Sequence, residues 1–326
     1  MKKQERVYAA MDGQPVDRIP LSLWRHFYKQ NQTPTGLASA TLAFYHQYDL
    51  DLIKLTPDDY YAVQDWGATV VLSKDDDTPS RLKKTVITKP EVWRNLTTLN
   101  PTQGRYAQEL EAIRLVVSQL GDNAAPLLMT LFSPLTLAYQ LAGDQLFEHL
   151  QSHPTDVHIG LATIAETTSR FADAVLEAGA DGIFFVSQLS HAGMLSEELC
   201  QTFVVRYDLI ALERVKSQPV PLVLYLPGSN PYFETANQYP VHAISWQNHD
   251  NTPSLQSALT LTEKTLMGGL NGNFLEQSRA DEVSAKVRML VTQARERLIL
   301  ACTEAISANT PSENLAAIVA SDRSLP

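Results

Sequence analysis

The chain has 326 residues, of which 44% are hydrophobic and 19% charged, the usual balance of a soluble globular protein. Its formal net charge of -10 argues against nucleic acid or an anionic membrane as a partner. Cys200 and Cys302 lie far apart without a CxxC motif, and Met1–Arg6 lacks an apolar signal region. No run approaches the roughly 20 apolar residues of a membrane span, so we expect a cytoplasmic protein.

Eight short apolar runs punctuate the chain, and each is nearly continuous rather than alternating in polarity. They are Ile19–Trp24, Leu50–Thr56, Pro126–Phe132, Gly182–Ser187, Pro221–Leu226, His242–Trp246, Thr265–Leu270 and Arg297–Cys302. Continuous apolar runs are typical of strands buried on both faces, as in parallel sheets. Most of the intervening segments are long enough to hold a crossover helix.

Three of these intervening segments carry the 3.6-residue apolar period of an amphipathic helix: Tyr106–Ser118, Ile159–Glu177 and Asp281–Arg297. The polar stretch Ser73–Thr88 predicts a loop or a small hairpin between the second and third strands. Strand and helix alternating about eight times predict an α/β protein with a parallel sheet. We therefore predict a single (β/α)8 TIM barrel domain over residues 1–326, with a doubly wound open sheet as the alternative.

Barrels of this kind place their chemistry on the loops at the carboxyl ends of the strands. In chain order, the polar residues that follow the eight predicted strands are Arg25, His26 and Lys29; Asp58 and Asp59; Ser133; Ser190 and His191; Ser229 and Asn230; Gln247, Asn248, His249 and Asp250; Asn271; and Glu304. Each also has an ordinary structural interpretation, such as a surface ion pair for Arg25, a turn or helix cap for Asp58, or a core histidine for His191. Their gathering at one end of a barrel is the stronger argument for a site.

Several common catalytic and cofactor motifs are missing from the sequence. It has no GxGxxG after a first strand, no GxxxxGK[ST], no GxSxG, no HExxH and no Cys/His cluster with ligand spacing. We therefore predict no cofactor and no metal. Positive and negative groups facing each other across such a cleft suit proton transfer and charge stabilisation on a small carboxylated substrate.

Six segments, in order along the chain, resemble the uroporphyrinogen decarboxylase superfamily, which also contains zinc-dependent methyl-corrinoid methyltransferases. These segments are Asp17–Pro20, Pro20–Arg25, Asp58 nine residues before Gly67, Pro134–Leu137 with Tyr139, Ser190–Gly193 and Thr310–Leu315. The resemblance covers nearly the whole chain and implies the barrel fold together with a homodimer.

The resemblance implies cofactor-free removal of CO2 from the acetate side chains of a tetrapyrrole or a related substrate. In that reaction Asp58 would stabilise the protonated pyrrole, and Arg25 would hold the departing carboxylate or deliver a proton. Ser190 and Tyr139 would bind carboxylates. Further residues expected at the site are Glu304, as a candidate acid or base, and the substrate-binding residues His26, Lys29, His191 and Asn271.

The chain departs from this family pattern at several positions. Lys29 stands where the decarboxylases have a second arginine, and Glu304 replaces the glycine-flanked histidine or the cysteine of the last strand. Tyr225 and Pro227 occupy the methyltransferases' His-x-Cys positions. The alternatives are a methyl-corrinoid methyltransferase-like enzyme with altered metal use, or a non-catalytic protein that binds a tetrapyrrole or another small ligand.

Overall fold

The computed structural model of the protein describes residues 1–248, 252–294 and 297–323. His249 and Asp250, which follow the sixth predicted strand, lie outside the described residues. Each of the eight predicted runs contains one strand. The strands are β1 (Leu21–Ser22), β2 (Ile53–Leu55), β5 (Leu127–Phe132), β6 (Gly182–Val186), β7 (Leu222–Leu226), β8 (Ala243–Trp246), β9 (Thr265–Leu270) and β10 (Leu298–Cys302).

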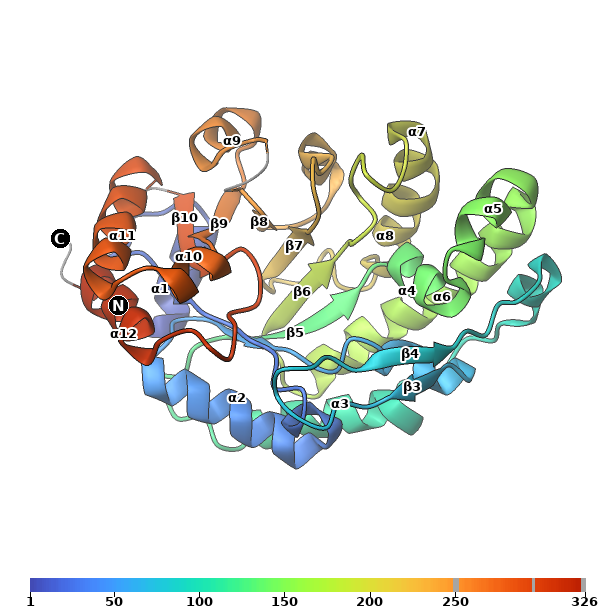
Figure 1. Ribbon diagram of the computed structural model, residues 1–326, viewed down its shortest axis with the longest axis horizontal. Helices are drawn as coiled ribbons and strands as arrows, with labels where there is room; N and C mark the ends of the chain where they lie inside the picture. The colour runs from blue at the N-terminus through green and yellow to red at the C-terminus, as the bar shows by residue number, and fades with distance from the viewer. Residues whose placement is uncertain (249–251, 295–296, 324–326) are drawn as a thin grey trace.

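These strands form one parallel sheet in the order β1-β10-β9-β8-β7-β6-β5-β2, so the first two strands of the chain lie at its two edges. The sheet curls into a nearly closed barrel surrounded by helices (Figure 1). The predicted TIM barrel is confirmed. The open sheet is excluded, because hydrogen bonds join β1 to the segment that leads into β2, as described below.

Helices cover the outside of the barrel, and α3, α6 and α11 confirm the three predicted from periodicity. The described helices are α1 (Lys3–Met11), α2 (Pro34–Tyr48), α3 (Gly104–Val117), α4 (Pro134–Ala142), α5 (Gln145–Ser152), α6 (Pro154–Glu177), α7 (Glu197–Leu199), α8 (Arg206–Ala211), α9 (Leu255–Leu261), α10 (Gly272–Gln277), α11 (Ala280–Ala294) and α12 (Ser312–Arg323). Shorter helical turns are η1 (Gln30–Gln32), η2 (Tyr61–Trp66), η3 (Pro90–Asn95) and η5 (Phe233–Gln238), and η4 (Cys200–Val205) is a π-helix. Among the described residues, no helix is both long and apolar enough to cross a bilayer.

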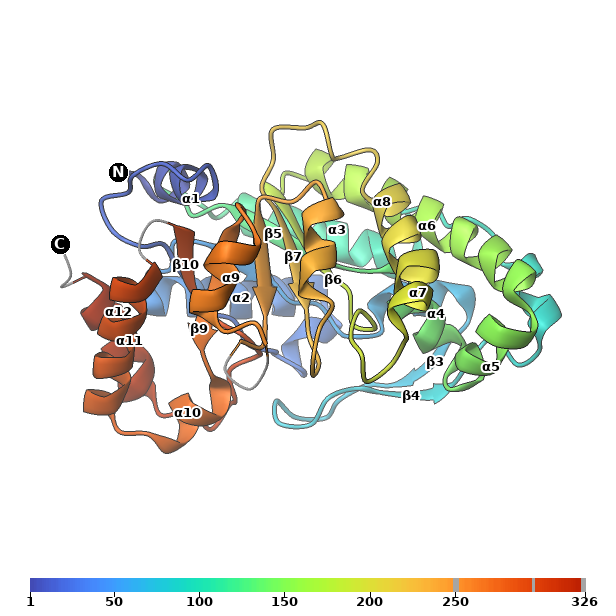
Figure 2. The same cartoon turned by 90° about the horizontal axis from the view of Figure 1, so that it is seen from above.

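An antiparallel hairpin of β3 (Thr69–Val71) and β4 (Arg81–Lys84) is inserted between β2 and β5. It confirms the hairpin interpretation of the polar stretch that starts at Ser73. Figure 2 shows it on the side toward which the strands point, opposite to α1. Asp76, in its connecting loop, accepts hydrogen bonds from the Lys29 backbone and the Gln30 side chain. The hairpin therefore forms part of the rim of the barrel mouth.

The seam between β1 and β2 is held by the fully buried Asp51. Its backbone N–H donates to the Leu21 carbonyl at 2.8 Å, and its carboxylate accepts from the Leu21 N–H at 3.0 Å. The same carboxylate binds the guanidinium groups of Arg6 at 2.7 Å and Arg18 at 2.6 Å. Arg18 in turn reaches Asp322 of α12 at 2.8 Å, so the first strands and the last helix share one ion network.

We predict that Asp51→Asn lowers the free energy of unfolding by about 2–3 kcal/mol, because it removes the charge-assisted hydrogen bonds to Arg6 and Arg18, which keep only Asp17 and Asp322 as counter-charges. Chemical denaturation followed by circular dichroism measures this loss. Asp281→Asn is the matched control, since the Asp281–Arg279 pair is exposed on both sides and contributes little. Equal effects of the two substitutions would contradict the proposed role of Asp51.

Candidate functional site

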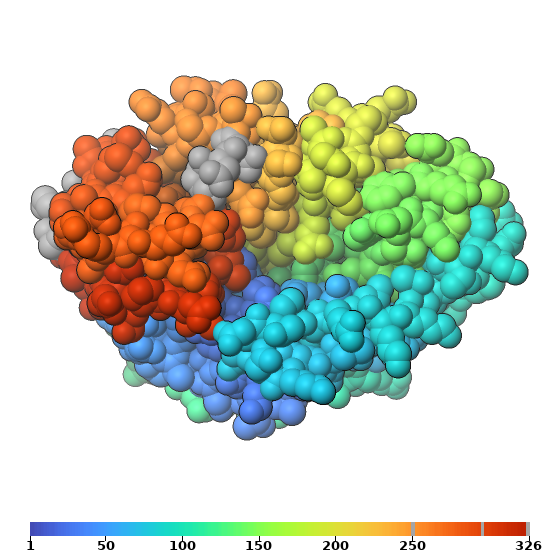
Figure 3. Space-filling model, viewed as in Figure 1, coloured from blue at the N-terminus to red at the C-terminus, as the bar shows by residue number. Residues whose placement is uncertain are grey.

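A cavity of about 170 Å³ opens where β1, β2, β5, β6 and β7 end. It is lined by Trp24, His26, Lys54, Thr56, Pro57, Asp59, Thr130, Phe132, Val186, Gln188, Tyr225 and Pro227. Figure 3 shows the surface hollowed at this mouth, between the hairpin and the segments that follow β6 and β7. The cavity thus lies at the end of the barrel where catalytic groups are expected.

Lys54 is the principal residue of the cavity that sequence reasoning missed. It lies on β2, where alternation along the strand turns its side chain into the barrel, and it is only 7% exposed. Its Nζ lies 3.7 Å from the centroid of the Trp24 ring and 4.8 Å from that of Phe184. It also donates to Thr56 Oγ1 at 3.2 Å. The sequence feature that could have identified Lys54 is its position between two apolar residues of a buried strand.

The titratable groups of the cavity are shifted toward their neutral forms. Burial lowers the pKa of Lys54 to about 7, although the charge of Asp59 opposes this shift. Burial, and then the charge of Asp58, raise the pKa of Asp59 to about 6 against the effect of Lys54. An acid and a base that both titrate near neutral pH therefore face one small space, as general acid–base chemistry requires.

His26 lines the same cavity, as its predicted substrate-binding role requires. Its Nδ1 lies 3.9 Å from Asp59 Oδ1, and its ring stacks on Tyr28 with centroids 4.8 Å apart. Burial, and then the charge of Lys54, lower the pKa of His26 to about 3. His26 is therefore neutral at pH 7, and its contact with Asp59 is not an ion pair.

Asp58 and its neighbour Asp59 face different surroundings. Asp59 lines the cavity, whereas Asp58 is fully buried and does not. Asp58 Oδ1 accepts the Tyr60 N–H at 3.0 Å, as in an Asx turn, and its charge contributes to the raised pKa of Glu109 on α3. Of these two neighbours, Asp59 is the one whose carboxylate lines the cavity, and the catalytic role predicted for Asp58 stays a prediction.

Three predicted residues lie outside the cavity lining. Arg25 Nε donates to the His26 carbonyl at 3.4 Å, and its guanidinium lies over the Phe27 ring at 5.4 Å. Lys29 is exposed beside the hairpin. The Tyr139 hydroxyl donates to Asp144 at 3.0 Å on the outer side of α4. Their predicted contacts with substrate therefore stay predictions that need movement of these side chains.

Ser190 belongs to a buried polar network below the rim rather than to the cavity lining. Its hydroxyl lies 2.8 Å from that of Ser187, which donates to Asp208 at 3.0 Å. Ser133 at 2.5 Å and Tyr239 at 2.8 Å also donate to Asp208. Burial raises the pKa of Asp208 to about 7, even though three hydroxyl groups stabilise its charge. Asp208, on α8, carried no motif and was not predicted.

His191 and Asn271 have local structural contacts. The His191 ring packs against Gly228, where an added Cβ would approach Cδ2 to 2.6 Å, and burial lowers the pKa of His191. Asn271 caps α10 by accepting the Phe274 N–H at 2.8 Å. Glycine at 228 is therefore required by the close approach of the loops that follow β6 and β7.

The three positions at which the family resemblance would place zinc ligands, namely Tyr225, Pro227 and Glu304, do not form a metal site. The Tyr225 hydroxyl donates to the Thr303 carbonyl at 2.6 Å, and Pro227 has no ligand atom in its side chain. Glu304 accepts the Gly272 N–H at 2.9 Å and the Gln247 amide at 3.3 Å. Within the described ranges, no group of three His, Cys, Asp or Glu side chains could hold an ion. These residues do not fit zinc.

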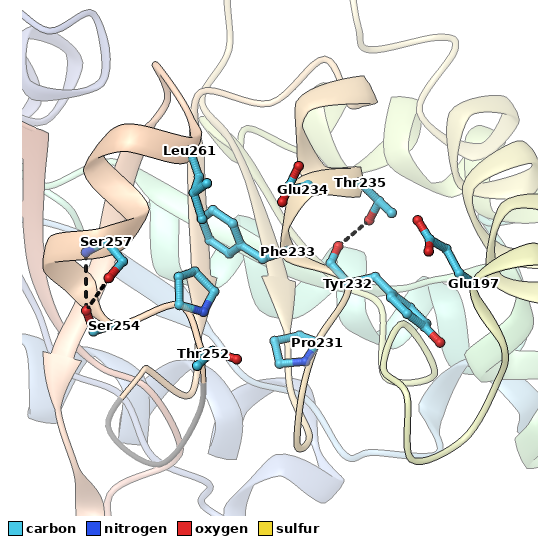
Figure 4. A pocket seen from close by; sticks show the side chains of 11 residues that line it. Glu197, Pro231, Tyr232, Phe233, Glu234, Thr235, Thr252, Ser254, Ser257 and Leu261 are labelled. Atoms are coloured by element: carbon cyan, nitrogen blue, oxygen red, sulfur yellow. Dashed lines mark hydrogen bonds between the residues drawn. The ribbon is translucent and has the colours of Figure 1, made fainter.

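A larger depression of about 750 Å³ lies outside the barrel, between the segments that follow β6, β7 and β8. Figure 4 shows Glu197 and Tyr232 on one side of it and Ser254 and Ser257 on the other. Its two carboxylates, those of Glu197 and Glu234, are exposed to solvent. We place the candidate site in the smaller cavity because perturbed titratable groups mark functional sites better than size does.

The family model described as uroporphyrinogen decarboxylase (URO-D) matches residues 2–325. The chain belongs to the uroporphyrinogen decarboxylase family. Within this family it is 22% identical over 239 residues to the methylcobamide:CoM methyltransferase MtbA of Methanosarcina acetivorans, covering 69% of this chain and 70% of the relative. It is 22% identical over 339 residues to MtaA of Methanosarcina barkeri, a protein with the same activity name, covering 97% and 96%.

A uroporphyrinogen decarboxylase from Rhodococcus opacus is 32% identical over 126 residues, which are 36% of this chain and 34% of that protein. The solved structure of a methyltransferase from Methanosarcina mazei superposes with a TM-score of 0.89 at 19% identity, covering 99% of both chains. This superposition independently supports the family's barrel fold.

We predict that Lys54→Met raises the free energy of unfolding at pH 7 by on the order of 2 kcal/mol. The folded protein holds the Lys54 proton less tightly than an unfolded chain with the ordinary lysine pKa of 10.5. The native lysine therefore costs stability that is regained as pH rises from about 7 toward 10. Denaturation of both proteins between pH 6 and pH 9.5 should show their difference shrinking with rising pH.

Lys264→Met is the matched control for this experiment. Burial lowers the pKa of Lys264 as well, but its Nζ donates to the carbonyls of Tyr239 at 2.9 Å and Val241 at 2.8 Å. Its removal leaves both carbonyls without that donor, so we expect a loss of stability. A Lys54→Met protein less stable than wild type at every pH would contradict the burial argument.

Proposed function

We propose that the protein is an enzyme that transfers a methyl group from a methylcobamide to a small acceptor held in the barrel-mouth cavity. The observation that carries this proposal is the cavity itself, which has about 170 Å³ for an acceptor and lies among groups that titrate near pH 7. The donor is much larger than the cavity, but only its methyl group needs to reach the acceptor. The full-length methylcobamide:CoM methyltransferase relative supports this reaction type.

Asp59 is the residue of the cavity best suited to prepare the acceptor. If the acceptor is a thiol, the sulfur forms a bond to the methyl carbon, the electron pair of the cobalt–carbon bond stays on cobalt, and the thiol proton must leave. A carboxylate with a pKa of about 6 is ionised at pH 7 and is a stronger base than an ordinary aspartate. In this proposal Asp59 takes the thiol proton, so the reaction needs no metal ion at Tyr225, Pro227 and Glu304.

Decarboxylation of a small carboxylated substrate is the second candidate. Lys54 favours it, because it is the one cationic side chain among the described residues that line the cavity. A polycarboxylated tetrapyrrole fits the cavity charge poorly, since Asp59 lines it and Glu304 acts on Tyr225 in its wall. The decarboxylase relative supports this candidate over about a third of the chain.

We predict that the purified protein, incubated anaerobically with methylcobalamin and 2-mercaptoethanesulfonate, demethylates the corrinoid and methylates the thiol. Asp59→Asn should lower kcat/KM by about 100-fold or more, the usual contribution of a general base. The wild-type rate should fall as pH drops through about 6, where Asp59 becomes protonated. Corrinoid absorbance and mass spectrometry of the thioether provide the two measurements.

Asp122→Asn is the control, because Asp122 is exposed on the loop before β5. Its rate and pH profile should match those of wild type. Conversion of uroporphyrinogen to coproporphyrinogen, or release of CO2 from a smaller acid, with no methyl transfer would replace the proposal with its second candidate. Tight binding of methylcobalamin without turnover would instead favour a non-catalytic binding protein.

A further inference from the structure

Lys54 has an unusual set of neighbours for a buried amine. Its Nζ donates a hydrogen bond to Thr56 Oγ1 at 3.2 Å, and the centroids of the Trp24 and Phe184 rings lie 3.7 and 4.8 Å from it. No carboxylate of the described residues forms an ion pair with it, and Asp59 acts on it only through its charge. Lys54 also lines the cavity at the barrel mouth.

Lys264, which is half-buried, has a different set of neighbours. Its Nζ is held by two backbone carbonyls, at 2.9 and 2.8 Å, which favour the protonated ammonium. Lys3, another mostly buried lysine, pairs with Asp49 and donates to Tyr45 at 3.2 Å. Lys54 differs from both because its only hydrogen-bond acceptor among the described residues is one hydroxyl group. The Trp24 and Phe184 faces attract its ammonium form, whereas burial without a carbonyl or carboxylate acceptor disfavours it.

We propose that the Lys54 amine is a nucleophile and that the cavity takes a small aldehyde or ketone, which condenses with it to form an imine. Desolvated lysines that meet a carbonyl group are the usual sites of this chemistry. The inference goes beyond methyl transfer and does not depend on it, because it concerns the reactivity of one amine and not the fate of a methyl donor.

The neighbouring groups balance the reaction without any oxidant or reductant. The nitrogen attacks the carbonyl carbon, forming the C–N bond, and the carbonyl oxygen becomes a hydroxyl. That hydroxyl takes one proton from the nitrogen. Asp59, which is ionised at pH 7, takes the second proton from the nitrogen and delivers it to the hydroxyl, which leaves as water. The two hydrogens of the amine and the carbonyl oxygen thus leave as one water molecule.

The walls of the cavity define the class of carbonyl compound. Trp24, Phe132, Val186 and Tyr225 present apolar surface, and Gln188 offers an amide for one polar group. Asp59 disfavours a second negative charge close to the amine. A small, uncharged aldehyde or ketone with an apolar substituent is therefore the expected ligand, and a volume of about 170 Å³ excludes large ones.

The test is reductive trapping of the intact protein with propanal and sodium cyanoborohydride at pH 7. We expect one propyl group to be added at Lys54, located by peptide mass spectrometry, at least ~10-fold faster than at the same residue in urea-unfolded protein. This ratio follows because the unprotonated fraction of an amine rises about tenfold for each unit by which its pKa falls, and burial lowers the pKa of Lys54 from 10.5 to about 7. Lys54→Met should lose the fast label while keeping slow labelling elsewhere.

Two outcomes would overturn the proposal: labelling that follows the exposure of surface lysines, or an unchanged fast label in Lys54→Met. Urea-unfolded wild-type protein should lose the preference for Lys54, which separates an effect of the fold from an effect of local sequence. Trapping requires no methyl donor, so its result is read independently of the methyl-transfer assay. Failure of that assay therefore leaves the imine test intact, and failure of trapping leaves methyl transfer intact.

Discussion

The closure of the barrel depends on one carboxylate, that of Asp51, at the seam between the first two strands. β1 and β2 are very short and stand at opposite ends of the strand order, so a continuous ladder does not join them. Asp51 bridges them through the backbone of Leu21, and Arg6 and Arg18 neutralise its charge. Removing one partner of a buried ion pair is strongly destabilising, so the seam needs both arginines as well as the carboxylate.

The same seam determines the geometry of the cavity at the other end of the strands. Trp24 follows β1 and Lys54 lies on β2, and they meet across the seam with Nζ 3.7 Å from the ring centroid. Trp24 is itself fixed by a hydrogen bond from Nε1 to the Cys302 carbonyl at 3.2 Å on β10. Any slip of β1 against β2 would therefore separate the amine from its aromatic cover, so barrel stability and amine reactivity rest on one junction.

Much of the fold was predictable from the sequence, because strands buried on both faces produce continuous apolar runs that can be recognised in the sequence alone. The loops carrying His26, Asp59 and Glu304 were predictable for the same reason, since barrel chemistry follows the strand ends. Side-chain direction was not predictable. Asp58 and Asp59 are adjacent, and only the turn at Tyr60 decides which one faces the cavity.

Lys54 and Asp208 were not predicted as site residues, because each lies within a strand or helix and only the loops after the strands were considered. Lys54 interrupts an apolar run together with Asp51, and both charges proved to be central to the structure. Asp208 is on a helix, and its three hydroxyl donors come from separate parts of the chain. A charged residue within an apolar strand is as informative as a polar loop residue, because its burial has to be stabilised by specific neighbours.

The packing of Tyr225, one of the three positions where zinc ligands were considered, is physically related to the lowered pKa of Lys54. Tyr225 directs its hydroxyl to the Thr303 carbonyl and presents its ring to Trp24 and Phe184, with centroids 6.3 and 5.6 Å apart. This places aromatic surface, rather than ligand atoms, around the base of the cavity. Burial there lowers the pKa of Lys54 to about 7, although the Trp24 and Phe184 faces attract its ammonium form. Tyr225 therefore contributes both to the aromatic wall of the cavity and to the burial of Lys54.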